Sequence, residues 1–190
     1  SPNETIVDIV KTNMSGLYSE IYEIYINQKL DNALVKRFIT KDISKIPKHK
    51  NVSHRMEAKL QHYASKHGLA PKVLAYSSKA IIMQRCDHPL ISKSFPDGYK
   101  WLKGLSFIER KAIRPYQTQI GSLNEALGTG PQAILEFTRN MYDKLGMYNL
   151  DPNIDNYMFI DNKLVQIDFG MNQFKDIESF NGFKEVESHV

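Results

Sequence analysis

Cysteine is almost absent from this sequence, which contains Cys86 and no other cysteine in 190 residues. A single thiol excludes a framework of internal disulfides, and such usage is typical of proteins in a reducing compartment such as the cytoplasm. The six histidines also lack the paired spacing of zinc ligands, so we expect no zinc site.

Long apolar runs are missing as well. No stretch approaches the roughly 20 consecutive apolar residues that a bilayer-spanning helix needs, so we expect no membrane span. The sequence as given also opens without the pattern of a secretory signal peptide. Hydrophobic residues nevertheless make up 42% of the chain, which is enough to build a core for one domain, or for two small lobes that share a cleft.

Positive charge is concentrated in one region of the chain. The formal net charge is +4, and much of the basic character falls within residues 36–59. The basic residues of this region are Lys36, Arg37, Lys41, Lys45, Lys48, Lys50, Arg55 and Lys59. We interpret the region as a solvated helix and loop beside an anion pocket, with binding of an acidic protein or a nucleic acid to this face as the alternative.

The first third of the chain predicts a meander of three antiparallel strands. Its apolar segments are Ile6–Val10, Leu17–Ile26 and Ala33–Ile39, separated by a turn at 13–16 and a polar stretch at 27–32. A loop that covers phosphates usually carries several glycines, because backbone N–H groups must approach the oxygens. Only Gly16 is present at this turn, which is a weak signal for such a loop.

A helix that Gly68 ends is predicted over residues 48–67. The face of this helix is formed by Met56, Leu60, Tyr63 and His67. Glu57 can then face the sheet, where it comes within reach of Lys36 at the end of the apolar run 33–35. Alone, such a lysine is usually an edge residue with its charge in water. A carboxylate that reaches it from a helix would give it a different role.

Two short extended segments follow the helix. They cover residues 71–76 and 80–83. The second ends in Gln84-Arg85-Cys86, and residues 87–89 then break it, so we place the crossing between two lobes here. The predicted division is an N-terminal lobe over 1–86 and a C-terminal lobe over 87–190.

The C-terminal half contains a predicted helix and a predicted hairpin. Residues 131–145 carry one apolar stripe at helical spacing, and Gly146 caps the helix. Further on, the apolar runs 157–160 and 163–167 flank Asp161-Asn162. Asp and Asn tolerate the left-handed backbone of tight turns, so this pattern indicates a β-hairpin.

This hairpin would return the chain to the edge from which it started. Asn156 would then lie just before the first strand and Asp168 just after the second, with Asp151 on the loop leading in. Carboxylate and amide oxygens that face one small volume suit Mg²⁺ on a nucleotide, held beside a general base.

Taken in order, these motifs resemble those of the protein-kinase-like family. Ala33-Leu34-Val35-Lys36 is similar to the family's V-A-I-K strand, and Glu57 to the helical glutamate that pairs with its lysine. Asp151 with Asn156 resembles the catalytic loop, and Asp168-Phe169-Gly170 is the DFG motif.

The resemblance covers roughly residues 5–172 and implies a fold. That fold is α+β and two-lobed, with an N-terminal antiparallel sheet, a helix packed on it, and a reduced helical C-terminal lobe. It also implies ATP and Mg²⁺ as cofactors. Adenine would meet the gatekeeper Met83 and the hinge backbone at Gln84–Cys86, and the phosphates would lie under the turn at Gly16.

The remaining roles follow from the same resemblance. Lys36 would hold the α- and β-phosphates, and Glu57 would orient that lysine. Asn156 and Asp168 would bind Mg²⁺. Asp151 would act as the base that accepts the proton of the substrate hydroxyl.

Several positions depart from the family pattern. Asn149-Leu150 stands where the family has His-Arg, so an arginine that could receive an activation-loop phosphate is missing there. Pro152 follows Asp151 directly, and Asn153 stands where many Ser/Thr kinases have lysine. Only 20 residues follow Gly170 in this sequence, so we expect no complete activation segment and no later helices of the large lobe.

Reduced kinases of this kind include bacterial type III effector kinases and the small kinase of the tRNA-threonylcarbamoylation complex; a viral or phage kinase fits as well. The first interpretation is a compact Mg-ATP-dependent kinase acting on Ser or Thr of a protein, or on itself. It would work in the cytoplasm, or in the host cytosol for an effector or viral protein. The alternative is a pseudokinase that docks a partner, with or without nucleotide. Small-molecule phosphotransfer is a third interpretation, but such enzymes need a large substrate lobe.

Overall fold

The computed structural model of the chain describes residues 4–12, 19–39, 54–89, 130–150 and 156–188. Over these segments the protein is an α+β fold that combines a mostly antiparallel sheet with three helices, as the sequence predicts at this coarse level. Two predicted site residues, Gly16 and Asp151, lie outside the described residues.

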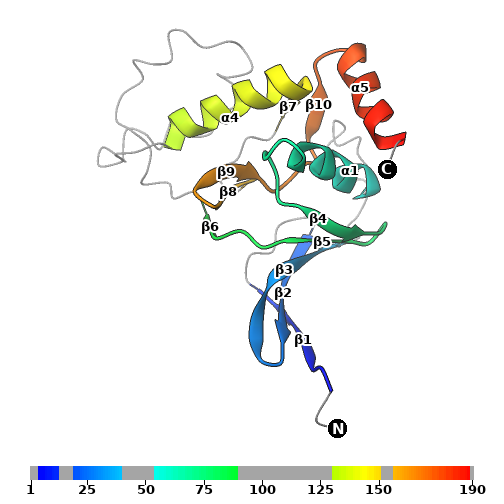
Figure 1. Cartoon of the computed structure of the whole chain (residues 1–190). Helices are drawn as coiled ribbons and strands as arrows, with labels where there is room; N and C mark the ends of the chain where they lie inside the picture. Colours follow the sequence, from blue (N-terminus) through cyan, green and yellow to red (C-terminus); the bar gives the residue numbers. More distant parts are fainter. Residues whose placement is uncertain (1–3, 13–18, 40–53, 90–129, 151–155, 189–190) are drawn as a thin grey trace.

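A five-stranded antiparallel sheet forms the N-terminal part of the molecule, with the strand order β1-β2-β3-β5-β4 (Figure 1). Its strands are β1 (Val7–Lys11), β2 (Ser19–Ile26), β3 (Lys29–Phe38), β4 (Val73–Tyr76) and β5 (Ala80–Gln84). The three predicted N-terminal strands and the two later extended segments are therefore confirmed, with shifted ends. Side chains of β3 alternate between the two faces of the sheet, and Leu34, Lys36 and Phe38 share the buried face.

The connection between β2 and β3 differs from the prediction. The sequence predicts that the polar stretch 27–32 separates two strands, but β3 begins at Lys29 and only Asn27 and Gln28 form the turn. Both have left-handed backbone, with φ of 49° and 67°. This is the geometry of a two-residue hairpin turn, whose twist matches that of the flanking strands.

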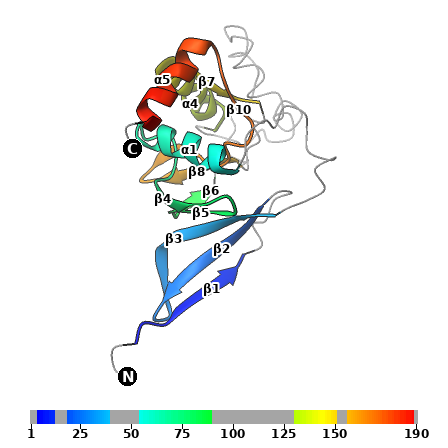
Figure 2. The ribbon, with the colours of Figure 1, turned by 90° about the vertical axis from the view of Figure 1, so that its right-hand side faces the viewer.

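Helix α1 (His54–Ser65) lies between the sheet and the C-terminal helices (Figures 1 and 2). It buries Glu57, Ala58, Leu60, Gln61 and Ala64. The helix ends at Ser65, two residues before the predicted end, and Gly68 follows with a φ of 72°, the left-handed conformation that favours glycine. Residues 48–53 of the predicted helix lie outside the described residues.

The C-terminal part contains the predicted hairpin, formed by β8 (Tyr157–Ile160) and β9 (Lys163–Gln166). Asp161 and Asn162 have φ of 50° and 62°, which confirms the tight turn. A third strand, β6 (His88–Pro89), pairs with β8. As predicted, the preceding strand ends before residue 87 and the chain crosses to another part of the molecule, but residues 88–89 form a strand of a second sheet, at whose edge Pro89 is tolerated.

Two helices and a small sheet complete the C-terminal part. Helix α4 (Gly130–Leu145) ends at Gly146, whose φ is 62°, as predicted. Strand β7 (Met147–Asn149) pairs with β10 (Asn172–Phe174), and α5 (Ile177–Ser188) follows. Neither this two-stranded sheet nor α5 is predicted from the sequence.

Two hydrophobic clusters hold these elements together. The smaller one lies between the five-stranded sheet and α1 and contains Leu34, Phe38, Ala58, Ile81 and Met83. The larger one joins α1, α4, the β8–β9 hairpin and α5, and its fully buried side chains include Leu60, Ile134, Tyr157, Phe169 and Phe183. Because α1 contributes to both clusters, it connects the sheet to the rest of the molecule.

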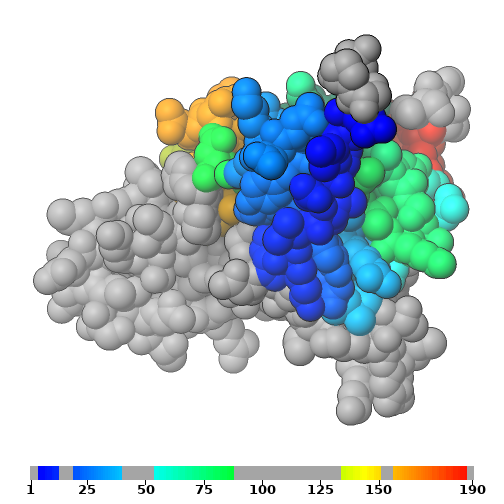
Figure 3. Space-filling view, turned by 90° about the horizontal axis from the view of Figure 1, so that it is seen from below, coloured from blue at the N-terminus to red at the C-terminus, as the bar shows by residue number. Residues whose placement is uncertain are grey.

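The apolar strand β1 lies on the surface at the edge of the sheet (Figure 3, blue). Ile6, Val7, Ile9 and Val10 are between 49% and 59% exposed. Among the helices of the described segments, none is both long and apolar enough to cross a membrane.

Candidate functional site

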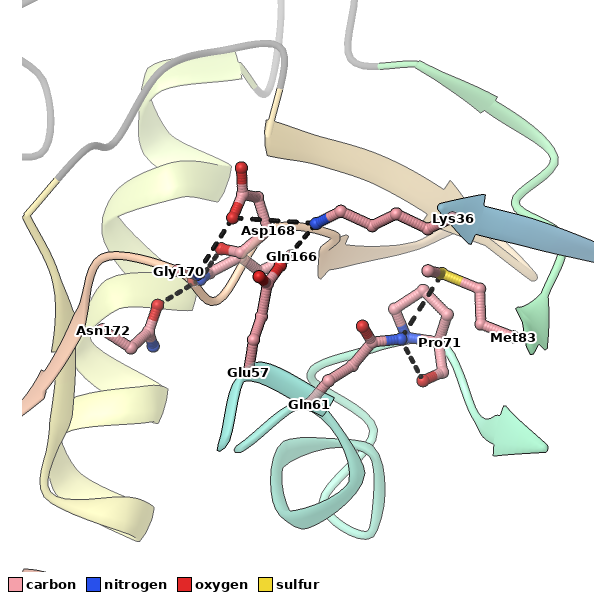
Figure 4. Close-up of polar contacts among 9 residues, drawn as sticks. All are labelled: Lys36, Glu57, Gln61, Pro71, Met83, Gln166, Asp168, Gly170 and Asn172. Atoms are coloured by element: carbon pink, nitrogen blue, oxygen red, sulfur yellow. Dashed lines mark hydrogen bonds and ion pairs between the residues drawn. The ribbon is translucent and has the colours of Figure 1, made fainter. Parts of the chain in front are cut away.

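The site is centred on the side chain of Lys36, which β3 directs into the interior beneath α1. Lys36 is 5% exposed and Glu57 of α1 is 2% exposed, and their side chains form a buried ion pair (Figure 4). The prediction that a helical carboxylate reaches this lysine is confirmed. A buried ammonium needs such a partner, because an unpaired charge in the interior is very costly.

Asp168 approaches the same ammonium from the end of β9. Its Oδ1 lies 3.8 Å from Lys36 Nζ, and 40% of its side chain is exposed. Lys36 therefore lies between one buried and one half-exposed carboxylate, which come from separate elements.

The protonation state of Lys36 follows from this arrangement. Burial by itself would lower the pKa of the ammonium, but the charges of Asp168 and Glu57, and the hydrogen bond to Glu57, outweigh it. The pKa of Lys36 is consequently raised above the ordinary value of 10.5. Lys36 is a fixed cation at any physiological pH.

The backbone around Asp168 is held by a short network of polar contacts. Asp168 Oδ1 accepts a hydrogen bond of 2.9 Å from the N–H of Gly170 (Figure 4). Gln166 donates from Nε2 to the carbonyl of Asp168 and to Oδ1 of Asn172, both at 2.6 Å. Gln166 and Asn172 are 1% and 4% exposed, and neither is among the site residues predicted from the sequence.

Asn156 lies at the same edge of the hairpin as Asp168, as predicted. Its backbone carbonyl accepts a hydrogen bond of 2.9 Å from the N–H of Ile167, the residue before Asp168. The predicted base Asp151 lies in the undescribed segment 151–155, which is flanked by Leu150 and Asn156. The N–H of Leu150 donates to the carbonyl of Met171 at 3.0 Å, so Leu150 adjoins the loop after Asp168.

The donor set determines which metal the site could accept. Within the described segments, no three His, Cys, Asp or Glu side chains gather closely enough to hold a metal ion. Mg²⁺ carried by a nucleotide does not need such a cluster, because one or two carboxylates and the phosphates share its coordination. The carboxylate of Asp168 and the amide oxygen of Asn156 are hard oxygen donors, which fit that ion.

The residues predicted to meet adenine lie at the end of β5. Met83 is 3% exposed and packs in the smaller core cluster, where its Sδ lies 3.4 Å from Gln61 Nε2. Gln84 is the last residue of β5 and pairs with Ala33. Cys86 is buried, and burial raises the pKa of its thiol to about 12. Residues 85–87 connect the two sheets, which is where the sequence predicted a crossing.

Half of the basic residues of the region 36–59 lie in the described part of the chain, so the predicted solvated face stays a prediction. Lys36 is buried in the site, and Lys59 of α1 is ion-paired with Glu187 of α5. Arg37 is exposed on β3. The other four lysines fall within residues 40–53, which lie outside the described residues.

A cavity of about 580 Å³ lies apart from Lys36, between α1, β4 and α5. Its apolar lining includes Tyr63, Leu74 and Phe183, and Lys66 contributes a basic side chain. This volume is in the range of small-molecule pockets. Size alone does not mark it as the site, because none of the predicted site residues lines it.

Comparison of the chain with known protein families found no family model that matches it, and comparison with curated proteins found no match. The functional interpretation therefore rests on the residues and geometry described above.

Proposed function

We propose that this protein is a compact Mg-ATP-dependent kinase that transfers the γ-phosphate to a Ser or Thr hydroxyl of a protein, or of itself. The observation that carries the proposal is the buried ammonium of Lys36 held between Glu57 and Asp168. A fixed cation at a helix-braced position is what the phosphates of a bound nucleotide require.

The order of the elements supports the same proposal. The lysine strand β3 is followed by α1, which carries the glutamate, and the chain then returns through β4 and β5 into the same sheet. In the C-terminal part, the β8–β9 hairpin brings Asn156 and Asp168 to one edge. This sequence of elements agrees with the two-lobed, kinase-like arrangement that the motifs imply, with lobes over 1–86 and 87–190.

Each residue would have a distinct task in phosphoryl transfer. Lys36 would bind the α- and β-phosphates while Glu57 keeps its ammonium in place. Asp168 and Asn156 would hold Mg²⁺, which neutralises phosphate charge when bound. Asp151 would take the proton of the attacking hydroxyl as its oxygen bonds to the γ-phosphorus and the bond to ADP breaks.

A phosphate-transfer assay tests the proposal directly. The protein is incubated with γ-labelled ATP and Mg²⁺, alone and with a generic basic protein, and labelled protein is measured. We expect label transfer by the wild type and its loss in Asp168→Ala, because the metal-binding carboxylate is removed. Asp143→Ala is the matched control, since Asp143 is an exposed carboxylate on α4, outside the site.

The pseudokinase alternative predicts a different pair of results. For a pseudokinase that retains the nucleotide, a thermal shift with Mg-ATP would still show stabilisation, because a ligand that binds only the folded state must raise its stability. Label would not be transferred from ATP to the protein itself or to the generic basic protein, whichever divalent metal is present. Absence of both binding and transfer would contradict the nucleotide site itself and favour a pseudokinase that docks a partner without nucleotide.

A further inference from the structure

The loop between β9 and β10 carries a half-exposed functional carboxylate but is fixed from within. The side chain of Asp168 is 40% exposed, so packing alone does not fix its rotamer. Its orientation toward Lys36 is set by the hydrogen bond from Gly170 N–H to Oδ1 and by the path of the backbone. Whatever holds that path therefore also determines where the carboxylate points.

Gln166 holds the backbone from the inside of the loop. Its Nε2 carries two hydrogens, and both are used at 2.6 Å, one on the Asp168 carbonyl and one on Asn172 Oδ1 (Figure 4). One amide nitrogen thus spans the loop from its start to its end. The backbone N–H of Gln166 is fixed as well, because it donates to the Leu69 carbonyl at 3.0 Å.

Asn172 provides the other end of the link. Its backbone N–H donates to the Phe169 carbonyl at 3.3 Å, and its Nδ2 lies 3.5 Å from Met141 Sδ in α4. Asn172 also pairs with Asn149 at the end of β7. Phe169, between the two amides, is 0% exposed. The loop is therefore closed by side chains that are themselves fixed in the core.

We propose that Gln166 and Asn172 form an amide clasp that keeps the Asp168 carboxylate directed toward Lys36. They are positioning residues, which act through the backbone of residues 168–170. The inference deepens the proposed function and rests on it for its consequence, which is a higher affinity for nucleotide-bound Mg²⁺. The clasp itself is a property of the protein without ligand.

A glutamine is specifically suited to this position. Two acceptors face one nitrogen, so only a group with two donors can satisfy both at once. Methionine matches the length of glutamine but donates nothing, and Gln166 Oε1 accepts no hydrogen bond from the described part of the chain. Gln166→Met therefore removes the two donated bonds and no others.

Gln61 offers a matched control. It is 0% exposed, its Nε2 donates to the Pro71 carbonyl at 3.2 Å, and its Oε1 likewise has no donor among the described residues. Gln61→Met makes the same chemical change at equal burial, but away from the Asp168 loop. Both variants are first checked for a cooperative unfolding transition.

The first measurement is amide hydrogen exchange of the protein without nucleotide. We expect exchange at Gly170 to be at least tenfold faster in Gln166→Met than in wild type, because the Asp168 acceptor is no longer held in place. Gln61→Met should leave Gly170 unchanged. If Gln166→Met fails to fold, Asn172→Leu, which removes the other end of the clasp, is measured in its place. Unchanged Gly170 exchange in the folded variant would overturn the clasp.

The second measurement is the Mg²⁺ concentration that gives half-maximal ATP binding, determined by calorimetry. Loss of a residue that orients a metal ligand typically weakens metal affinity 10–100-fold, and we expect a shift of about tenfold in Gln166→Met. ATP binding in EDTA should not change. Faster amide exchange at Gly170 in Gln166→Met, with an unchanged Mg²⁺ concentration for half-maximal ATP binding, would overturn the positioning role. A wild type that binds no Mg-ATP would refute the proposed function, while the exchange experiment still decides the clasp.

Discussion

At the scale of single residues, the ion pair between Lys36 and Glu57 is the most consequential contact, because both charges are removed from water. Removing one member of a buried pair leaves the other uncompensated, which typically costs about 3–5 kcal/mol. Replacing both by apolar groups removes that penalty. The pair therefore contributes more to fixing the position of the Lys36 ammonium than to the stability of the fold.

A double-mutant cycle measures this directly. Lys36→Met should lower the free energy of unfolding by about 3 kcal/mol, and Lys36→Met with Glu57→Leu by clearly less. Because the pKa of Lys36 is raised, its stabilising contribution is fully present below pH 10.5 and is lost only as the pH rises through the raised pKa. Urea unfolding should give the same differences in the free energy of unfolding between these variants at pH 6 and at pH 8. A double variant less stable than the single one would contradict the explanation.

Cys86 provides a second test at this scale. Burial raises the pKa of its thiol to about 12, so at pH 8 only roughly one molecule in ten thousand carries the reactive thiolate. We expect iodoacetamide to label the folded protein very slowly and the urea-unfolded protein at the rate of a free cysteine. Fast labelling of the folded protein, measured by mass spectrometry, would contradict the buried position.

The residue scale also shows what the sequence could not reveal. Lys36, Glu57 and Asp168 were predictable because charged residues in apolar surroundings and a DFG motif are visible as patterns. Gln166 and Asn172 were not, because a polar amide in the sequence looks the same whether it is solvated or buried. Only the fold shows that their hydrogen bonds are satisfied inside the core.

At the scale of elements, the glycine after α4 controls a contact that is distant in sequence. Gly146 has a φ of 62°, and a Cβ built on it would lie 2.0 Å from Ser179 Oγ and 2.4 Å from Ser179 Cβ in α5. Gly68, after α1, has a similar φ of 72° and open space around its Cβ position. The two helix ends share the same backbone requirement but differ in packing.

This difference leads to a paired prediction. Gly68→Ala should cost about 1 kcal/mol, because an L-residue is strained in left-handed backbone. Gly146→Ala should cost at least twice as much, since α5 must also move away. Thermal unfolding of both variants compares them under one condition. Equal losses would show that α5 does not pack against Gly146 in solution.

Prediction of the elements succeeded where the signal is local. The β8–β9 hairpin follows from Asp161-Asn162 between apolar runs, and α4 from one apolar stripe that ends at a glycine. Strands β7 and β10 have three residues each and pair across more than twenty positions, so no local pattern marks them. Helix α5 did have a signal: Asp176 caps it by accepting from Ser179 N–H at 2.7 Å, and Ile177, Phe180 and Phe183 are spaced by three.

At the scale of the whole molecule, the larger core cluster includes residues from both sides of the predicted boundary at 86/87. Leu60 and Leu69 pack in it together with Ile134 and Phe183. Phe183 also contacts Tyr63 of α1, with ring centroids 5.4 Å apart. The division into two lobes stays a prediction about shape, but the packing joins α1 to the C-terminal elements.

Shared packing predicts shared unfolding. Phe183→Ala should lower the free energy of unfolding by about 3–5 kcal/mol, because Phe183 is 1% exposed. Val186→Ala on the same helix is the control, and with 38% exposure it should cost much less. We expect one transition by both fluorescence and circular dichroism in all three proteins. A separate early transition in Phe183→Ala would show that α5 unfolds independently.

The charges around Lys36 have a consequence for what can enter the site. Among the described residues of the centre, Lys36 and Glu57 neutralise each other, so the half-exposed carboxylate of Asp168 leaves one net negative charge. A bare polyanion would meet repulsion there, whereas a cation, or an anion that carries one, would be attracted. The centre therefore favours ligands that bring a positive charge, whatever their shape. A triphosphate without a divalent ion should bind weakly. In a triphosphate that carries a divalent ion, the ion would supply the attraction to Asp168.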